Sequence, residues 1–91
     1  MIIRQYEDEI PMELVVSTLE RMGFKASRIE DGHDLYYSSA ARTYTENDMV
    51  VHAKKGMFNK MKIELNNEMN LVFVHGDETD AKAFLDNLAR I

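Results

Sequence analysis

Two stretches of the chain carry apolar residues at helical spacing, one near each end. They predict amphipathic helices over about residues 11–23 and 78–90, because positions i, i+3, i+4 and i+7 line one face of a helix. Pro11 suits a first turn, Gly23 supplies a stop, and Asp77 caps the second helix. The stripes are Met12, Val15, Val16, Leu19 and Met22 in the first helix, and Ala81, Phe84, Leu85, Leu88 and Ile91 in the second. Each stripe needs an apolar surface to cover.

The region between these helices carries the alternating pattern of β-strands. Met61, Ile63 and Leu65 alternate with charged residues, which predicts a strand with one buried face. A loop at residues 66–68 would place Leu65 opposite Met69 in the next strand, and would leave one face of this hairpin wholly apolar.

Further strands are expected at residues 1–6, 25–30, 33–39 and 49–53. The Asp31-Gly32 pair predicts a hairpin between the second and third of these, and side-chain parity favours a three-residue loop at residues 30–32. The polar stretch 38–48 has no clear period, so we expect it to be a loop.

These elements predict an α+β fold in a single domain over residues 1–91, because 91 residues have room for one core. We expect a two-layer sandwich in which a mainly antiparallel sheet of five to six strands carries both helices on one face, in the order β-α-β-β-β-β-β-α. The opposite face is expected to carry Tyr36, Val72, Val74, Lys60 and Lys62. Two interpretations of this outer face remain open: lysine and arginine stems cover its valines, or it binds a partner or a second copy of the chain.

Composition excludes several kinds of chemistry. The chain has no cysteine, which rules out disulfides and thiol catalysis, and its four glycines are isolated, so no phosphate-cradling loop of the known glycine-rich kinds is present. Three histidines, His33, His52 and His75, lack local metal-ligand spacing. We therefore expect no metal, no cofactor and, on balance, no enzymatic activity. With no apolar stretch of membrane-spanning length and no signal-like start, a cytoplasmic protein is expected.

Acidic residues gather at the two predicted helix starts. They are Glu7, Asp8 and Glu9 before the first helix, and Asp77, Glu78 and Asp80 at the second. One interpretation is that they complement the helix dipoles. The other is that they form one continuous acidic surface for a protein partner. The leading hypothesis is a small non-enzymatic protein-interaction module, a regulator or inhibitor that acts through this acidic surface or a sheet edge, alone or as a homodimer.

Charge is uneven along the chain, whose formal net charge is −5. Residues 40–62 hold five basic and two acidic side chains, with Tyr44 and Phe58 nearby. A basic patch beside aromatic residues suits single-stranded nucleic acid, so an RNA-binding or RNA-cleaving module is the alternative hypothesis.

One local pattern supports that alternative. From Leu14 to Tyr36, a helix ending in Gly23-Phe24 is followed by Arg28 and Gly32-His33 before an aromatic strand. This stretch, about a quarter of the chain, resembles part of the HicA-type toxins that cleave messenger RNA. The resemblance implies a catalytic role for His33, with Arg28 nearby. In that family a serine precedes the histidine, whereas here Gly32 does.

Overall fold

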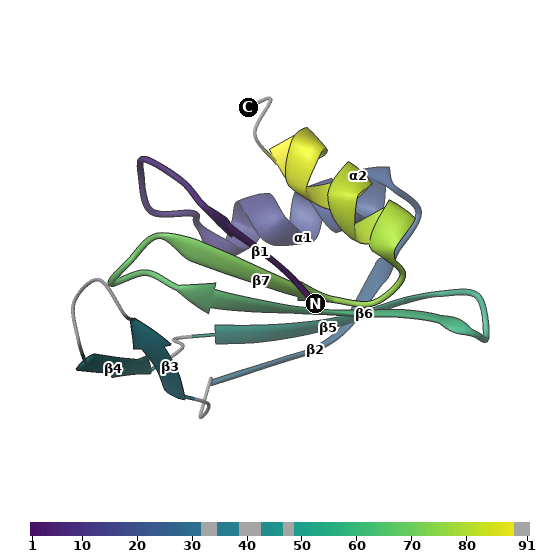
Figure 1. Ribbon diagram of the computed structural model, residues 1–91. Helices are drawn as coiled ribbons and strands as arrows, with labels where there is room; N and C mark the ends of the chain where they lie inside the picture. Colours follow the sequence, from purple (N-terminus) through teal and green to yellow (C-terminus); the bar gives the residue numbers. More distant parts are fainter. Residues whose placement is uncertain (32–34, 39–42, 47–48, 89–91) are drawn as a thin grey trace.

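The computed structural model describes residues 1–31, 35–38, 43–46 and 49–88. Its strands are β1 (Ile2–Gln5), β2 (Lys25–Asp31), β3 (Leu35–Ser38), β4 (Thr43–Glu46), β5 (Met49–Lys55), β6 (Asn59–Asn66) and β7 (Leu71–His75). Its helices are α1 (Met12–Arg21) and α2 (Glu78–Leu88). Five strands form an antiparallel sheet in the order β1-β7-β6-β5-β2, and both helices cover one face of it (Figure 1). The predicted two-layer α+β fold is confirmed.

The helices begin and end for the reasons that the sequence suggests. Gly23 follows α1 with a φ of 87°, and the Phe24 N–H donates to the Leu19 carbonyl at 2.9 Å, which closes the helix as a Schellman motif does. At the start of α2, the Asp80 N–H donates to Oδ2 of Asp77 at 3.0 Å, so Asp77 caps the helix.

The core lies between the helices and the sheet. The apolar stripes of both helices pack on the inner residues of the three central strands. The core residues from the helices are Val15, Leu19, Ala81, Phe84, Leu85 and Leu88, and those from the central strands are Val51, Ala53, Met61, Ile63, Leu65, Val72 and Val74.

The register of β6 against β7 differs from the prediction. Ile63 lies opposite Val74 and Leu65 opposite Val72, because β6 continues through Asn66 and the turn occupies residues 67–70. Oδ1 of Asn66 accepts a hydrogen bond from the Met69 N–H at 3.0 Å, which stabilises this longer turn. An odd change in register sends every side chain of a strand to the other face. Val72 and Val74 are therefore completely buried under the helices, and their predicted place on the outer face is wrong.

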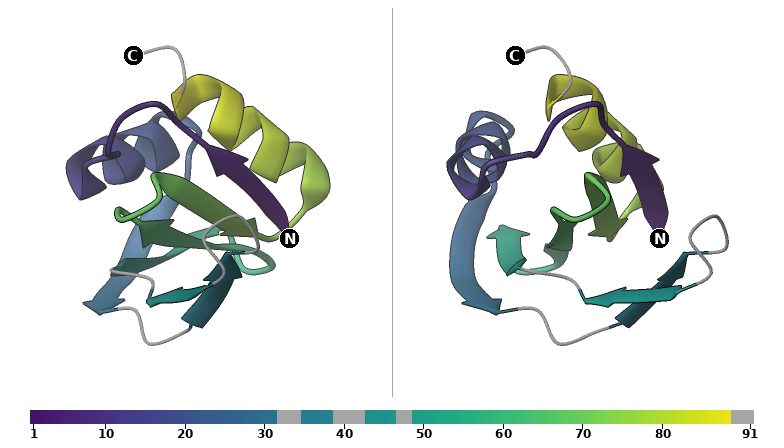
Figure 2. Two further views of the ribbon diagram at one scale, coloured as in Figure 1. Left: turned by 60° about the vertical axis from the view of Figure 1, so that its left-hand side comes forward. Right: turned by 90° about the vertical axis from the view of Figure 1, so that its left-hand side faces the viewer.

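The predicted hairpin between residues 25–30 and 33–39 is also wrong. β2 pairs with β5 along its length, whereas β3 pairs with β4 in a separate two-stranded ladder. Part of the stretch expected to be a loop is thus strand β4. The β3–β4 pair lies on the side of the sheet away from the helices, beside the end where β2 finishes and β5 begins (Figure 2). The β5–β6 turn (residues 56–58) lies at the opposite end of the sheet from the β3–β4 pair (Figure 1).

Candidate functional site

A row of basic side chains crosses the outer face of the sheet on four adjacent strands. Arg28 lies opposite His52, His52 opposite Lys62, and Lys62 opposite His75. Two residues closer to the β5–β6 turn on the same two strands, Lys54 lies opposite Lys60. Partners across a ladder project to the same face, and the core residues Val51, Ala53, Met61, Ile63 and Val74 alternate with this row on β5, β6 and β7. This row therefore faces away from the helices.

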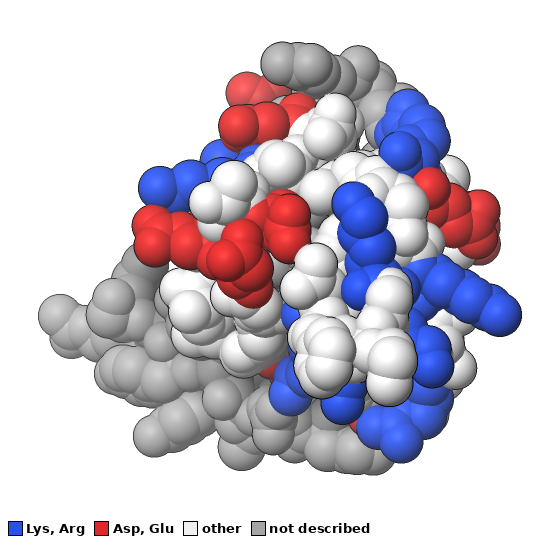
Figure 3. Space-filling view, turned by 90° about the vertical axis from the view of Figure 1, so that its right-hand side faces the viewer, with Lys and Arg blue, Asp and Glu red and all other residues white. Residues whose placement is uncertain are grey.

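These side chains line one hollow, which we call the basic groove. Its volume is about 730 Å³, and its charged or titratable lining residues are Arg28, His52, Lys54, Lys60, Lys62 and His75. Figure 3 looks at the end of the molecule that carries the β5–β6 turn, and shows lysine and arginine side chains gathered in its lower right, with the larger groups of acidic side chains above. Although the net charge of the chain is negative, the basic groove is a local surface that attracts anions.

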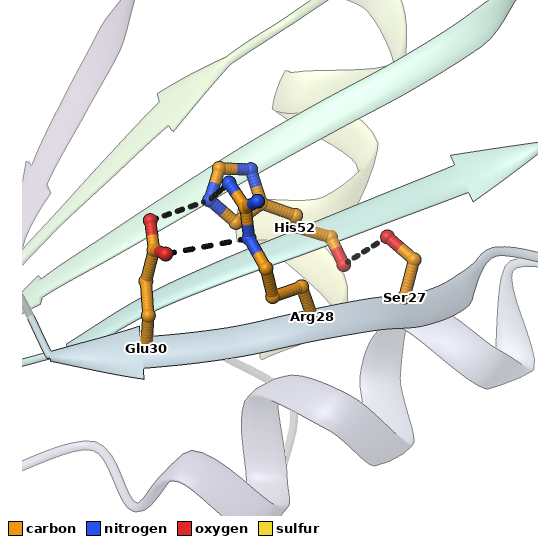
Figure 4. Close-up of polar contacts among 4 residues, drawn as sticks. All are labelled: Ser27, Arg28, Glu30 and His52. Atoms are coloured by element: carbon orange, nitrogen blue, oxygen red, sulfur yellow. Dashed lines mark hydrogen bonds and ion pairs between the residues drawn. The ribbon is translucent and has the colours of Figure 1, made fainter.

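On the β2 side of the groove, one carboxylate joins two basic groups (Figure 4). Oε1 of Glu30 lies 2.9 Å from Nε2 of His52, and Oε2 lies 3.3 Å from Nε of Arg28. The Arg28 guanidinium also lies 3.2 Å from Nε2 of His52. Nε2 cannot both accept from Arg28 and donate to Glu30, and the carboxylate is the stronger partner. We therefore assign Nε2–H of His52 as the donor to Glu30.

On the β7 side, a second carboxylate, that of Glu64, is hydrogen-bonded to His75. Oε2 of Glu64 lies 2.6 Å from Nε2 of His75, and only 3% of Glu64 is exposed. The side chain of His75 is 36% exposed and that of His52 is 27% exposed, so both rings are open to solvent at the groove. A carboxylate on Nε2 fixes the ring and its tautomer, and leaves Nδ1 to exchange a proton.

The β5–β6 turn, beyond the groove residues Lys54 and Lys60 along the two strands, carries exposed apolar side chains. Met57 and Phe58 are 85% and 89% exposed, the largest exposures among the large hydrophobic side chains that the structure describes. Exposed aromatic rings beside basic groups can stack on unpaired bases. Nearby, Nζ of Lys55 lies 5.9 Å from the centre of the Phe24 ring, so Lys55 also packs beside the end of α1.

The acidic clusters do not meet. Residues 7–9 follow the end of β1, where the Tyr6 N–H donates to the Asn70 carbonyl beside the start of β7. Residues 77–80 follow the end of β7. The five residues of β7, about 16 Å of strand, separate the two groups, and Figures 1 and 2 show the two segments at opposite ends of the sheet. The expectation that Glu7, Asp8, Glu9, Asp77, Glu78 and Asp80 form one continuous surface is wrong.

Several acids have local structural roles instead. Asp77 caps α2, and Oε1 of Glu78 lies 3.1 Å from Nζ of Lys82 one turn later. Both contacts are those expected of a solvated helix start.

The other predicted site residues fall into two groups. Lys60 and Lys62 lie on the outer face as expected, and Arg28 joins them in the groove. His33, which the HicA resemblance implies as catalytic, lies outside the described residues, as does the side chain of Tyr36. Sequence reasoning missed His52 and His75 as neighbours of Lys62, because only the strand order brings them together.

The part of the chain that the structure describes contains no cluster of three or more potential metal ligands. Within the same residues, neither helix is long and apolar enough to span a bilayer. Comparisons of the chain with protein-family models, with curated proteins and with solved structures found no match.

Proposed function

We propose that this protein binds single-stranded RNA across the basic groove on the outer face of its sheet. The observation that carries the proposal is the gathering of Arg28, Lys54, Lys60 and Lys62 in one open hollow, in a chain whose net charge is negative. Phosphate contacts supply most of the affinity of such binding, so a local group of cations is sufficient.

The spacing of the cations supports a strand-shaped ligand. Lys60 and Lys62 project from the same face of β6, two residues and so about 6.7 Å apart. This is of the order of the distance between successive phosphates in an extended strand. Arg28 lies three strands away from His75 across the groove, which gives the ligand room to cross the sheet.

Fluorescence anisotropy of a labelled single-stranded RNA of about 12 nucleotides tests this proposal. We expect binding at about 50 mM salt, with a slope of log affinity against log salt of about −2 to −3, because each phosphate contact on a single strand contributes about −0.7. Lys62→Glu should weaken binding about tenfold and reduce the slope.

Lys82→Glu is the matched control, because it changes the net charge equally on α2, away from the groove. Its affinity should stay within about twofold of the wild type at this salt concentration. Absence of binding at about 50 mM salt, or an equal effect of the two substitutions, would overturn the proposal.

A second candidate function is protein interaction through a sheet edge. β2 (Lys25–Asp31) ends the order of the five-stranded sheet and pairs with β5 alone among the described strands, and Ile29 on it is 42% exposed. An edge strand of seven residues can add a strand from a partner or from a second copy. In this case the chain would act as a small regulator or inhibitor, alone or as a homodimer.

Analytical ultracentrifugation tests whether the chain is a homodimer or a monomer in solution. A 21 kDa species at tens of micromolar that Ile29→Lys converts to the 10.6 kDa monomer would support dimerisation through β2. A single 10.6 kDa species for the unmodified chain would remove the homodimer.

A further inference from the structure

We propose that the basic groove also cleaves the RNA strand that it binds, with His52 and His75 as the two proton-transfer groups and Lys62 at the reacting phosphate. This inference rests on the proposed function. It differs from the role implied for His33 by the HicA resemblance, because it uses residues that the strand order places in the groove.

The first argument is the arrangement of the three side chains. His52, Lys62 and His75 occupy directly opposed positions on β5, β6 and β7 and line the same hollow. Neighbouring strands lie about 4.8 Å apart, so about 10 Å separates the backbones of the two histidines. A phosphate with a hydrogen bond of about 2.8 Å on each side fits between two imidazoles at this separation. Lys62, which lies between the two histidines in the strand order, supplies a positive charge for this phosphate.

The second argument is the orientation of both rings by carboxylates. Glu30 binds Nε2 of His52 at 2.9 Å, and Glu64 binds Nε2 of His75 at 2.6 Å. Each contact leaves Nδ1 as the nitrogen that can take or give a proton. Glu30 and Glu64 are therefore positioning residues. Two oriented imidazoles on either side of a cation are suited to acid–base catalysis at a phosphate.

The third argument is that RNA supplies its own nucleophile. Nδ1 of one neutral imidazole takes the proton of the ribose 2′-hydroxyl, and the 2′-oxygen forms a bond to phosphorus. The bond between phosphorus and the 5′-oxygen breaks, and the other imidazole, which is protonated, gives its proton to that oxygen. The products are a 2′,3′-cyclic phosphate and a 5′-hydroxyl. Lys62 stabilises the negative charge that accumulates on the phosphate oxygens, and Arg28, two strands away in the same groove, adds positive charge to the site.

The test uses the full chain and a 5′-labelled single-stranded RNA of about 12 nucleotides, in buffer with a chelator of divalent metals. Binding is measured by anisotropy, and products are measured by gel and mass spectrometry. We expect fragments that end in a cyclic phosphate, and no cleavage of the matched 2′-deoxy strand although it binds. His52→Ala and His75→Gln should each slow cleavage by at least about 100-fold and change affinity by less than about threefold. Circular dichroism checks that each variant is folded.

Each outcome decides between the proposals. RNA that binds but stays intact overturns cleavage and leaves the proposed binding function standing, whereas RNA that neither binds nor breaks overturns both. Cleavage that survives in both histidine variants, or that only His33→Ala abolishes, assigns the activity elsewhere and overturns this inference. A bell-shaped dependence of the rate on pH, lost in either histidine variant, would support it, because one ring must be neutral while the other is charged.

Discussion

Nε2 of His75 lies 2.6 Å from Oε2 of Glu64, a carboxylate that is only 3% exposed on the outer face of the sheet. A buried carboxylate is costly unless it is hydrogen-bonded, so this contact stabilises the fold as well as orienting the ring. The same pair therefore links the stability of the sheet to the chemistry of the basic groove.

The first prediction concerns that pair. His75→Ala should lower the free energy of unfolding by about 1–2 kcal/mol, because it removes a partner of a nearly buried carboxylate. A double-mutant cycle with Glu64→Gln, followed by urea unfolding, should give a coupling energy near 1 kcal/mol. The exposed pair of Glu78 and Lys82 is the control, with an expected coupling of about 0.3–0.5 kcal/mol. Equal couplings in the two cycles would show that the burial of Glu64 has no energetic effect.

The second prediction tests the register of β7. Val74 is completely buried opposite Ile63, so Val74→Ala should cost about 1.5–3 kcal/mol through lost burial and a residual cavity. Phe58→Ala, at a side chain that is 89% exposed, should change stability by less than about 0.5 kcal/mol. Denaturant unfolding of the two variants compares them directly. If Val74→Ala changed the stability as little as Phe58→Ala, β7 would have the register expected from the sequence, with Val74 on the outer face.

The third prediction uses Tyr6, which packs between the end of β1 and α2. Its Oη donates to the Leu85 carbonyl at 3.1 Å, and burial raises the pKa of the phenol above 10.0, although Arg4 acts in the opposite direction. The folded protein thus holds this proton more tightly than the unfolded chain does. The contribution of this proton to the free energy of unfolding is fully present below about pH 10, and it decreases as the pH rises toward the folded-state pKa of Tyr6.

Tyr6→Phe should therefore cost about 1 kcal/mol near neutral pH, through the lost hydrogen bond, and less at high pH. Urea unfolding at about pH 8 and about pH 10.5 measures the difference between the two proteins at each pH. The difference should shrink at the higher pH. A constant difference would contradict the assigned direction of the shift.

The fourth prediction concerns Phe58 on the β5–β6 turn, two residues before the groove residue Lys60. If its ring stacks on a base, Phe58→Ala should weaken binding of single-stranded RNA by about 1 kcal/mol, or about fivefold. Met57→Ala removes a neighbouring side chain of similar exposure, and should change the affinity by less than about twofold. Anisotropy titrations at one salt concentration give both values. Equal losses would point to general contact by the turn and against stacking.

The helices, the two layers and the outward position of Lys60 and Lys62 follow from the sequence, because periodicity along one segment specifies which face of that segment is buried. The partner of β2 and the register of β7 do not follow in this way. The Asp-Gly signal is local, and pairing of β2 with β5 across the intervening chain outweighs it. At β7, the side-chain hydrogen bond of Asn66 favours a longer turn and reverses the parity of the whole strand.

The candidate site could be predicted only in part for the same reason. Lys60 and Lys62 belong to one strand, and their common face is readable from their spacing. The contact between His52 and Glu30, and that between His75 and Glu64, each join residues on different strands. Their approach depends on strand order and register, which no single segment encodes.

The central claim, that RNA binds across the outer face of the sheet, is tested most directly by following backbone amide signals by NMR during titration with a single-stranded RNA. We predict that the largest shifts occur at Arg28, His52, Lys62 and His75, while residues 7–9 and the exposed side of α2 change little. Shifts confined to the acidic helix starts, or absent from the four groove residues at saturating RNA, would contradict the account.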